Sequence, residues 1–311
     1  MLLVVSTNPT IDRTLELPVL HPHGVHRSQR IWLSAGGKGL NVGRAAKNLD
    51  LPYRVVGVLG GFTGELLAKL AREEGLETSW LRFPELETKM SYLLKHRRGD
   101  STVINEPGPR LEPQRWRELV NFILEESRPA QAVVLAGSVP PGVESGAYFE
   151  LCRQLSERVP EILVDTPGHT LQAVVADPRR LSIKVNREEL GEALGFRLKN
   201  DRDLYQAGRL LLERGARLVC ITLGREGAMA FDERGAWRAS FEAPHFVSSV
   251  GSGDSFSAGL SLYALRGMEL PQALAWASAC GAANAQTDLP AQFTLEGVER
   301  LVPQIEVQAV V

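Results

Sequence analysis

The sequence predicts an α/β protein whose mostly parallel sheet is covered by helices on both faces, with a second, smaller sheet beside it. Two observations predict the large sheet: short apolar runs alternate with helical patterns, and glycine-rich or polar loops follow most of these runs. Residues 11–33 and 88–106 predict the small sheet, because they alternate apolar and polar residues around turn signals. This sheet is expected to act as a lid that excludes water from a ligand site. The alternative is a pair of edge hairpins without that role.

The alternation can be followed element by element along the chain. Apolar runs predict buried strands at residues 2–7, 53–60, 130–137, 161–166, 181–186 and 217–224. Periodic apolar positions predict helices at residues 40–49, 64–75, 148–159, 203–215 and 253–267. In such a sheet, ligands bind in the loops after the carboxyl ends of the strands. Functional residues are therefore expected in those loops.

Composition and charge exclude several classes of protein. The 311 residues carry a formal net charge of −2, so no overall field attracts nucleic acid or membranes. No apolar stretch is long enough to span a bilayer, and the N-terminal run is too short for a signal peptide. Cys152, Cys220 and Cys280 are far apart in apolar contexts, which predicts buried, reduced thiols. We expect a soluble protein of the cytoplasm.

Several common catalytic motifs are absent from the sequence. It has no G-x-x-x-x-G-K-[ST] phosphate loop, and GSGDSF at residues 251–256 lacks the third glycine of a dinucleotide-binding fingerprint. No histidine, cysteine and carboxylate cluster has zinc-ligand spacing, and no G-x-S-x-G elbow indicates a serine hydrolase. The chemistry must therefore come from other groups.

The first candidate site is AGGKGLNVGRAAKNL, residues 35–49. Gly36 and Gly37 allow a ligand to approach the backbone closely, and a helix follows at once. Lys38 adds a positive charge and Asn41 adds a side-chain amide in the first turn. The stretch predicts a cradle for an anion or a polyol. The alternative is an ordinary strand-to-helix turn.

The second candidate is KVNREEL, residues 184–190. Lys184 and Asn186 alternate at the end of a strand, so both side chains can point into one crevice. Glu189 follows within one helical turn, and an amide with a carboxylate suits the water shell of a magnesium ion. The alternative is solvated charge at a helix start. ITLGREGA, residues 221–228, is another glycine-bearing strand end that could hold a nucleotide.

The third candidate is SSVGSGDSFSAGL, residues 248–260. The backbone N–H groups of Gly251, Ser252 and Gly253 lie at a helix start, where an anion is favoured. Asp254 follows directly, although a carboxylate would repel such an anion. The ordinary alternative makes Asp254 the N-cap of the helix. Two polar cradles and one carboxylate indicate two substrates and one transferred group.

Together, the two glycine-rich stretches resemble the two signatures of the PfkB carbohydrate kinases, which belong to the ribokinase-like superfamily. NPTID (8–12), GSVPPG (137–142), DTPG (165–168), KVNREEL and ITLGREGA occur in that family's order and spacing. The resemblance covers nearly the whole chain. It implies one kinase domain over residues 1–311 with a three-layer α/β/α body. It also implies a lid that forms a homodimer, and ATP- and Mg²⁺-dependent phosphorylation of a sugar hydroxyl.

The resemblance also implies roles for individual residues. It assigns the sugar to Asp12, Gly36, Gly37, Lys38 and Asn41. It assigns the nucleotide to Lys184, Asn186, Thr222, Gly224 and Gly227, the surroundings of the adenine to Asn284, and magnesium, through water, to Glu189. Asp254 is the implied base, and the backbone amides of Gly251, Ser252 and Gly253 are the implied anion hole.

Within the family, NPTID, AGGKGLNV and NEPGP (105–109) are most similar to the branch of 1-phosphofructokinase and tagatose-6-phosphate kinase. Two positions depart from the pattern. Ser252 replaces an alanine, which a small residue should tolerate. Lys89 stands where an arginine grips the sugar phosphate, and lysine binds phosphate only as a point charge. Arg27 and Arg110 are further basic candidates for that phosphate.

The resemblance predicts an enzyme that transfers the γ-phosphoryl group of MgATP to a phosphorylated ketohexose. Fructose 1-phosphate is the first candidate, and tagatose 6-phosphate and fructose 6-phosphate are alternatives. A kinase of an unphosphorylated sugar or nucleoside also fits the motifs. A sugar-binding regulator would need no base, and an oxidoreductase would need the missing fingerprint.

Overall fold

The computed structural model describes residues 1–96, 100–241 and 245–310. Its strands are β1 Leu2–Ser6, β2 Thr10–Leu17, β3 Arg30–Gly36, β4 Tyr53–Gly60, β5 Thr78–Phe83, β6 Lys89–His96, β7 Asp100–Asn105, β8 Ala132–Ala136, β9 Glu161–Asp165, β10 Ser182–Asn186, β11 Leu218–Thr222, β12 Ala228–Asp232, β13 Gly235–Ser240 and β14 Glu306–Ala309. Its α-helices are α1 Lys38–Asn48, α2 Gly61–Glu73, α3 Pro113–Glu126, α4 Ser145–Ser156, α5 Gly168–Ala176, α6 Arg187–Leu194, α7 Asp201–Glu213, α8 Ser252–Leu260, α9 Leu262–Arg266, α10 Leu270–Ala285 and α11 Leu295–Leu301. Two short 3₁₀ helices are η1 Gly224–Glu226 and η2 Val302–Gln304.

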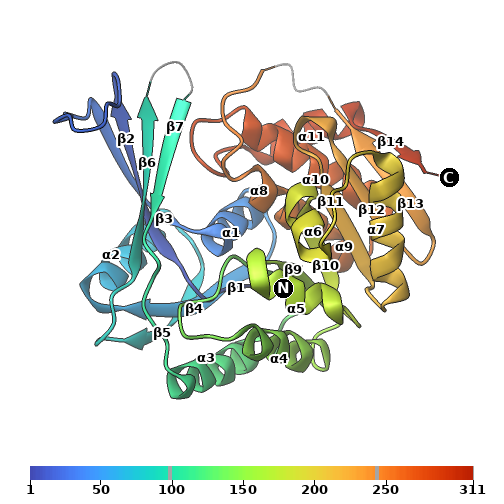
Figure 1. Cartoon of the computed structure of the whole chain (residues 1–311), viewed down its shortest axis with the longest axis horizontal. Coiled ribbons are helices and arrows are strands. Elements are labelled where there is room, and N and C mark those ends of the chain that lie inside the picture. The colour runs from blue at the N-terminus through green and yellow to red at the C-terminus, as the bar shows by residue number, and fades with distance from the viewer. Residues whose placement is uncertain (97–99, 242–244, 311) are drawn as a thin grey trace.

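The body is built on a 10-stranded sheet in the order β14-β13-β12-β11-β10-β9-β8-β1-β4-β5. The strands from β11 to β5 run parallel, and β12, β13 and β14 continue the sheet antiparallel. Helices cover both faces of the sheet (Figure 1). The predicted α/β/α layering with a mostly parallel sheet is confirmed.

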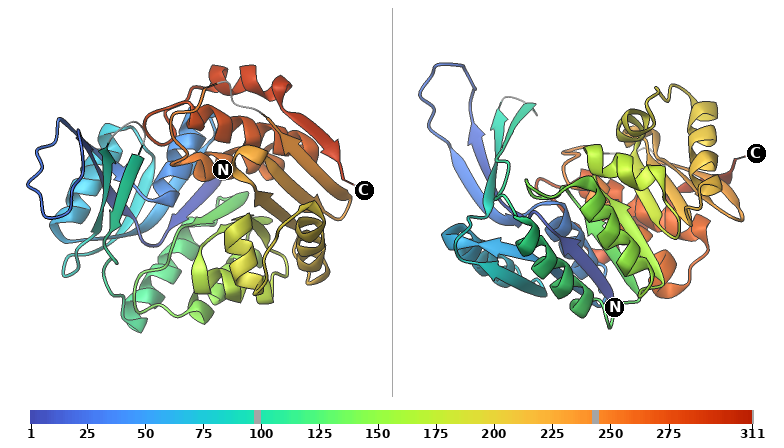
Figure 2. Two further views of the ribbon diagram at one scale, coloured as in Figure 1. Left: turned by 45° about the horizontal axis from the view of Figure 1, so that its top comes forward. Right: turned by 60° about the horizontal axis from the view of Figure 1, so that its bottom comes forward.

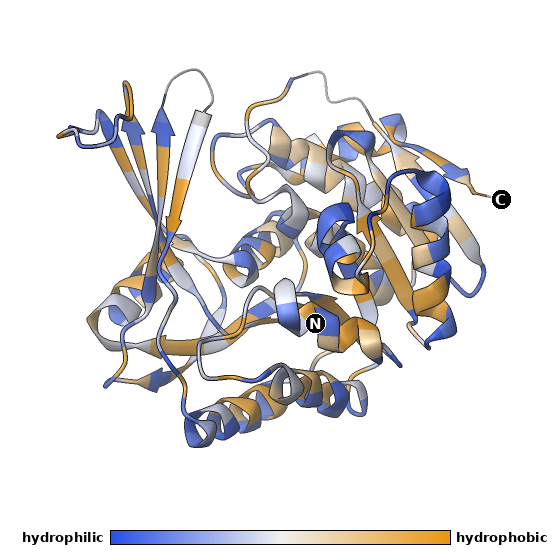
Figure 3. Cartoon of the chain, viewed as in Figure 1, coloured by the Kyte–Doolittle hydropathy of each residue, from blue (hydrophilic) through white to orange (hydrophobic). Residues whose placement is uncertain are grey.

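The core consists of one apolar layer on each face of the large sheet. Successive strand residues point to opposite faces, so Leu2 and Val4 join one layer while Leu3 and Val5 join the other. The first layer includes residues of α1, α8 and α10, and the second includes residues of α3, α4 and α7. Apolar residues therefore run along the central strands, and polar residues lie on the outer sides of the helices (Figure 3).

A second sheet has four strands in the order β3-β2-β6-β7 and projects from the body (Figure 2). β2 pairs antiparallel with β3, and β6 pairs antiparallel with β7, so the two hairpins predicted at residues 11–33 and 88–106 are both present. The parallel pairing of β2 with β6 joins them into one sheet. The predicted turn between β6 and β7 includes residues 97–99, which lie outside the described residues.

The structure differs from the sequence prediction at the C-terminal end of the chain. The single helix predicted at 253–267 is divided at Ser261, whose hydroxyl donates to the Ala258 carbonyl oxygen at 2.6 Å. Such a bond within a helix competes with the regular backbone pattern and bends the helix. The sequence analysis also did not predict β12, β13 and β14, which extend one edge of the sheet.

Other expectations concern the cysteines and the membrane. Cys152, Cys220 and Cys280 are all free and buried, as predicted. Burial raises the pKa of each thiol well above its usual value. Within the described ranges, no helix is both long and apolar enough to cross a bilayer.

Candidate active site

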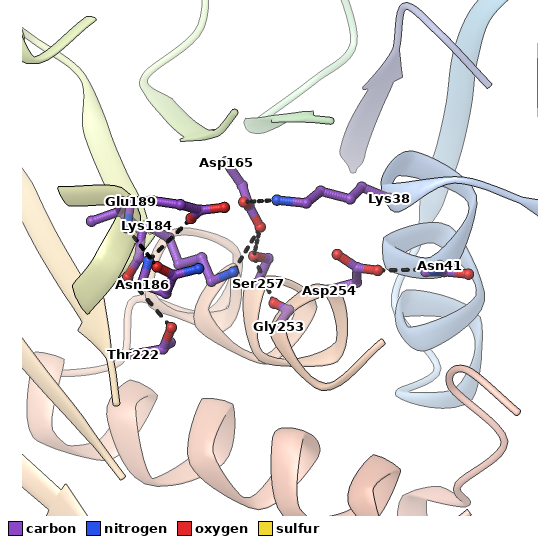
Figure 4. A network of polar contacts seen from close by, with 11 residues as sticks. Lys38, Asn41, Asp165, Lys184, Asn186, Glu189, Thr222, Gly253, Asp254 and Ser257 are labelled. Carbon is purple, nitrogen blue, oxygen red and sulfur yellow. Dashed lines mark hydrogen bonds and ion pairs between the residues drawn. The ribbon is translucent and has the colours of Figure 1, made fainter. Parts of the chain in front are cut away.

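Polar side chains from six elements converge beyond the carboxyl ends of β9, β10 and β11 (Figure 4). The start of α8 provides Gly253 and Asp254, and α1 provides Lys38 and Asn41. This is the end of a parallel sheet at which ligands bind. The first and third candidate stretches, 213 residues apart at Asn41 and Asp254, are thus joined in one site.

Asp165, the last residue of β9, lies at the centre of a buried ion cluster. Its two carboxylate oxygens accept from the Nζ atoms of Lys38 at 2.8 Å and Lys184 at 2.9 Å, and Ser257 Oγ donates to it at 3.0 Å. Burial alone would raise the pKa of Asp165, but the two lysines outweigh it and hold the pKa well below its usual range. Burial works against the charge of Lys38, yet Asp165 raises the pKa of that lysine above its usual value.

Asp254 lies between this cluster and α1. Its side chain is buried, and Oδ2 accepts from Asn41 Nδ2 at 2.8 Å. Burial and the charge of Asp165 raise the pKa of Asp254, while Lys38, Lys184 and the Asn41 hydrogen bond oppose the increase. Gly251, not Asp254, is the N-cap of α8, so the capping interpretation of Asp254 is wrong. The carboxylate is directed at the site instead of at the backbone of its own helix.

The loop before α8 is held by Asn284 of α10. Asn284 Nδ2 donates to the Val250 carbonyl oxygen at 2.9 Å and to Ser252 Oγ at 3.0 Å, and its Oδ1 accepts from the Ala291 N–H at 2.7 Å. These bonds occupy the side-chain amide and direct it at the loop. The resemblance assigns Asn284 to the surroundings of the adenine, and the geometry shows in addition that it supports the glycine-rich loop.

The three residues predicted to form the anion hole, Gly251, Ser252 and Gly253, have different surroundings. The Ser252 N–H donates to the Ser249 carbonyl oxygen at 3.1 Å, so that amide is already occupied. Gly251 has φ of 83°, a conformation that favours glycine, and a Cβ there would come within 2.7 Å of the Pro290 side chain. Gly253 packs against Lys184 Nζ, which a Cβ would approach to 2.8 Å. The loop therefore brings the lysine next to the backbone at the start of α8.

The first cradle combines β2, β3 and α1. Gly37 has φ of 91° and is the N-cap of α1, and a Cβ on Gly36 would overlap the carboxylate of Asp12. Burial raises the pKa of Asp12 to about 6, although the Gly37 N–H and the positive charges of Arg44 and Lys89 oppose it. Burial lowers the pKa of Lys89, and Asp12 opposes that change. The structure thus brings Asp12 and Lys89 together at the base of the small sheet.

The nucleotide-side residues follow β10 and β11. Asn186 caps α6: its Oδ1 accepts from the Glu189 N–H at 2.8 Å, and Glu189 Oε2 accepts from the Asn186 N–H at 3.3 Å. This capping box gives both side chains a structural role at the start of α6, which the sequence analysis did not predict. Thr222 Oγ1 donates to the Val185 carbonyl oxygen at 3.4 Å, which ties the ends of β10 and β11 together.

The remaining predicted positions are less central. Gly224 has φ of 60° and open space around it, whereas a Cβ on Gly227 would overlap the carbonyl of Ala239 in β13. Gly227 is therefore explained by packing of the β12–β13 hairpin. Arg110 is exposed beside Glu112, with Nε and Oε1 3.3 Å apart, and Arg27 is exposed in the loop between β2 and β3. Neither arginine belongs to the ion cluster.

Residues 3–294 match the sequence profile of the pfkB family carbohydrate kinases. The chain belongs to this family. The 1-phosphofructokinase of Bacillus subtilis (strain 168) is 28% identical over 307 residues, which cover 99% of each chain. A candidate phosphofructokinase from Staphylococcus aureus is 28% identical, with a TM-score of 0.82, 100% of this chain covered and 99% of that chain.

The solved structures also agree with the fold of this pfkB kinase. Phosphofructokinase-2 from Escherichia coli, determined in complex with substrates and products, has a TM-score of 0.90 and 24% identity, covering 97% of this chain and 98% of that chain. At that identity the likeness concerns the fold. The match of residues 3–294 to the family, together with the Bacillus relative, makes the protein a phosphotransferase with an alcohol group as acceptor.

The residues of this pfkB kinase fit a magnesium ion that keeps most of its water shell. Within the described ranges, no group of three or more His, Cys, Asp or Glu side chains could enclose a metal. Mg²⁺ beside phosphates needs only one or two carboxylates. Glu189 Oε1 accepts no hydrogen bond from the described residues. The negative charge of Glu189 is among those that raise the pKa of Lys38 against the effect of burial, so the carboxylate faces the site. Glu189 could therefore hold such an ion through water.

Two elements of the site escaped the sequence analysis. Asp165 ends a predicted buried strand and begins DTPG, but a buried aspartate at a strand end does not reveal which cations it will meet. Ser257 looks like a small residue of an amphipathic helix, and only the packing of α8 against β9 shows its contact with Asp165. For Asp165, the available signal in the sequence was a polar residue at the end of an apolar strand.

Proposed function

We propose that this pfkB kinase transfers the γ-phosphoryl group of MgATP to a hydroxyl of a phosphorylated ketohexose. Fructose 1-phosphate, giving fructose 1,6-bisphosphate, is the proposed substrate. The observation that carries the proposal is the buried carboxylate of Asp254, held by Asn41 at 2.8 Å between the two glycine-rich stretches and next to the ion cluster of Asp165. A sugar hydroxyl bound in the first cradle would lie beside that carboxylate.

Asp254 is the proposed base. It removes the proton of the attacking hydroxyl as that oxygen bonds to the γ-phosphorus, and the bond from phosphorus to the β,γ-bridging oxygen of ATP breaks to release ADP. The raised pKa of Asp254 brings it closer to the operating pH, which suits a general base. Lys38, Lys184 and the Gly253 N–H at the start of α8 are positioned to stabilise charge on the transferred phosphoryl oxygens.

Substrate choice is proposed to depend on the first cradle. Asp12 and the backbone of Gly36 and Gly37 are the proposed ligands of the sugar hydroxyls, and Lys89 is the proposed ligand of the sugar phosphate. Lys89 lies near Asp12 at the base of the small sheet, so a sugar whose hydroxyl groups meet Asp12 would bring its phosphate within reach of this lysine. The names of the Bacillus and Staphylococcus relatives agree with a phosphofructose substrate.

The nucleotide is proposed to bind beyond β10 and β11. Lys184, Asn186, Thr222 and Gly224 line those strand ends. Magnesium, held through water by Glu189, would supply charge neutralisation at the phosphates. Because Asn186 and Glu189 cap each other, the protein holds both side chains in place before any ligand arrives. Gly227 and Asn284 support the loops around this region.

The small sheet is proposed to be the lid of a single kinase domain over residues 1–311. Asp12, Lys89 and Lys95 lie on one face of it, because Thr10 is paired with Lys89 and side chains alternate along each strand. Lys95 Nζ donates to the Asp288 carbonyl oxygen at 3.0 Å, so this face looks toward the body. The opposite face carries exposed Ile31, Leu33 and Ile104, which supports a homodimer through the lid. We propose a cytoplasmic location on the sequence grounds given above.

The substrate proposal is tested by measuring kcat/KM with fructose 1-phosphate, fructose 6-phosphate, tagatose 6-phosphate and free hexoses in an ADP-release assay. We expect the highest kcat/KM with fructose 1-phosphate. A higher value with another phosphosugar would change the named substrate. A preference for a free hexose, with no increase in KM when Lys89 is replaced by Met, would overturn the phosphosugar proposal.

A further inference from the structure

Arg44 of α1 lies one turn after Asn41 and is the centre of a second polar network, behind the site. Its side chain is only 13% exposed. Nε donates to Glu74 Oε2 at 2.8 Å, Nη2 donates to the Ala35 carbonyl oxygen at 2.6 Å, and Nη1 donates to Asn41 Oδ1 at 2.9 Å. Neither Arg44 nor Glu74 belongs to the residues assigned above to sugar, nucleotide or metal.

The hydrogen bond from Arg44 determines which way the Asn41 amide faces. A guanidinium has only donors, so it can meet only the carbonyl oxygen of the amide. The NH₂ group of Asn41 must then point the other way, where its Nδ2 is 2.8 Å from Asp254 Oδ2. An ionised carboxylate has only acceptors, so both ends of the chain of bonds require the same orientation.

Glu74 fixes Arg44 in turn. Glu74 follows the last residue of α2, and its Oε1 accepts from the Ala35 N–H at 3.0 Å. Glu74 and Arg44 thus bind both backbone polar groups of Ala35, the residue before the Gly36–Gly37 turn. A fork-shaped guanidinium paired with a carboxylate gives defined geometry. The network therefore links the end of α2, the glycine turn and the Asn41 side chain.

We propose that Arg44, held by Glu74, is a positioning residue that orients the Asn41 amide so that its NH₂ group donates to Asp254. The proposal rests on the proposed function in one respect, the role of Asp254 as the base. Without Arg44 the amide can turn its oxygen to Asp254. That contact requires a protonated carboxyl group, and a protonated Asp254 cannot accept the proton of the substrate hydroxyl.

Other charged groups face the two ends of this network. Asp254 is near Asp165 from β9, Lys38 from α1, Lys184 from β10 and Asp12 from β2. Arg44 is near Glu74, Asp12 and Tyr53. The variants below leave all these partners in place. A change in the titration of Asp254 then reports on the amide and on the lost Arg44 charge, which a lysine at position 44 would retain.

The test is the pH dependence of kcat for Arg44→Ala and Arg44→Lys. Both variants lose the guanidinium group that orients the Asn41 amide, and with it the hydrogen bond from Asn41 to the ionised form of Asp254. We therefore expect the acidic limb of the pH profile of kcat to move to higher pH by about one unit. At pH 7, kcat should fall about tenfold or more, with KM for MgATP within about twofold of wild type. Millimolar guanidinium should restore part of kcat in Arg44→Ala.

Arg54→Ala is the matched control. Arg54 also pairs with a glutamate of a neighbouring helix, at 3.1 Å between its Nη1 and Glu126 Oε2, but it lies outside the site. We expect its acidic limb to match wild type and guanidinium to have no effect. An acidic limb unmoved in both Arg44 variants would overturn the proposal. So would a loss of kcat in Arg44→Ala that guanidinium leaves unchanged.

A second readout does not depend on turnover. The carboxyl carbon of Asp254, assigned by NMR through comparison with Asp254→Asn, can be titrated in the unliganded protein. We expect a higher pKa in Arg44→Lys than in wild type, and an equal or lower pKa would contradict the proposal. If Asp254→Asn retains wild-type turnover, the proposed base is wrong. If Asp254→Asn is inactive while both Arg44 variants titrate like wild type, only the positioning proposal fails.

Discussion

Asp165 accepts from two lysines at once, and both lysines would lose this carboxylate partner if its charge were removed. Lys184 is almost fully buried, and Lys38 is about one third exposed. Breaking a buried ion pair on one side is more damaging than replacing the whole pair, because the remaining charge keeps its desolvation penalty. Asp165 therefore has two roles: it stabilises the folded body, and it holds the ammonium groups of Lys38 and Lys184 in the site.

Asp165→Asn is expected to lower the free energy of unfolding by about 3 kcal/mol at pH 7. The pKa of Asp165 is lowered in the folded state, so its contribution is complete above the unfolded pKa of about 4 and is lost as the pH falls through the folded value. Urea unfolding of wild type and variant should show a constant difference above about pH 5 that shrinks below pH 4.

The control for this prediction is Asp177→Asn. Asp177 pairs with Arg179 at 2.6 Å at the surface, where an ion pair contributes less than about 1 kcal/mol. Equal effects of the two substitutions on unfolding would contradict the stabilising role of the Asp165 cluster.

Asp12→Asn is expected to stabilise the protein while weakening its substrate binding. Burial raises the pKa of Asp12 to about 6 in the folded state, so its ionisation opposes folding fully above that pH and not at all below about pH 4. The gain in the free energy of unfolding should be up to about 2 kcal/mol at pH 8 and disappear near pH 4. In the same variant, KM for the phosphosugar should rise, because Asp12 is a proposed ligand of the sugar hydroxyl groups. Unfolding curves that show no gain at pH 8 would contradict the raised pKa.

At the scale of the elements, glycine positions explain how backbone and side chains approach each other so closely. α1 and α8 both begin after a glycine with positive φ, Gly37 and Gly251. In this way neither helix start needs a capping side chain, and Asp254 is free to face Asn41. The sequence revealed the two glycine-rich helix starts but not that the N-cap of α8 is a glycine without a capping side chain, because N-cap preference is a local average that tertiary packing overrides.

Gly251→Ala is expected to lower both stability and kcat. The φ of 83° alone makes an alanine unfavourable by about 1–2 kcal/mol, and its Cβ would also conflict with Pro290, which displaces the loop before Asp254. Gly195→Ala is the control, because Gly195 has φ of 79° but open space around it. It should lose similar stability from strain and keep wild-type kcat. Equal kcat values for the two variants would argue against a role for the loop in positioning the site.

At the scale of the whole molecule, the sequence was sufficient for the fold class, for both hairpins and for the positions of the central strands along the chain, but it predicted neither the order of those strands in the sheet nor helices α3, α5 and α10. Alternating apolar runs and periodic helices depend on local residues, so they can be read along the chain. The ion cluster could not be predicted, since Asp165, Lys38 and Lys184 meet only when β9, α1 and β10 are packed. The same is true of Arg44, whose role depends on the end of α2.

The outer face of the small sheet predicts the assembly of the molecule. Ile31, Leu33 and Ile104 are 42–53% exposed, and a charge among them should prevent two copies from packing. We expect wild type to have twice the chain mass of 34.1 kDa by analytical ultracentrifugation, and Ile104→Glu to have the mass of one chain. Phe196→Glu, on a similarly exposed residue of the body, should remain dimeric. A monomeric wild type, or a dimeric Ile104→Glu variant, would contradict the proposal that the protein forms a dimer through the small sheet.

The central claim, that Asp254 removes the proton of the acceptor hydroxyl, is tested most directly by single-turnover ADP release from Asp254→Asn, with the enzyme in excess over MgATP and with saturating fructose 1-phosphate. Asn keeps the shape of the side chain and an acceptor for Asn41. We predict a rate at least about a hundredfold below wild type, with MgATP binding and the unfolding transition preserved. Asp232→Asn, which removes another buried carboxylate at a distance from the site, should turn over like wild type. A rate for Asp254→Asn close to that of wild type would contradict the account.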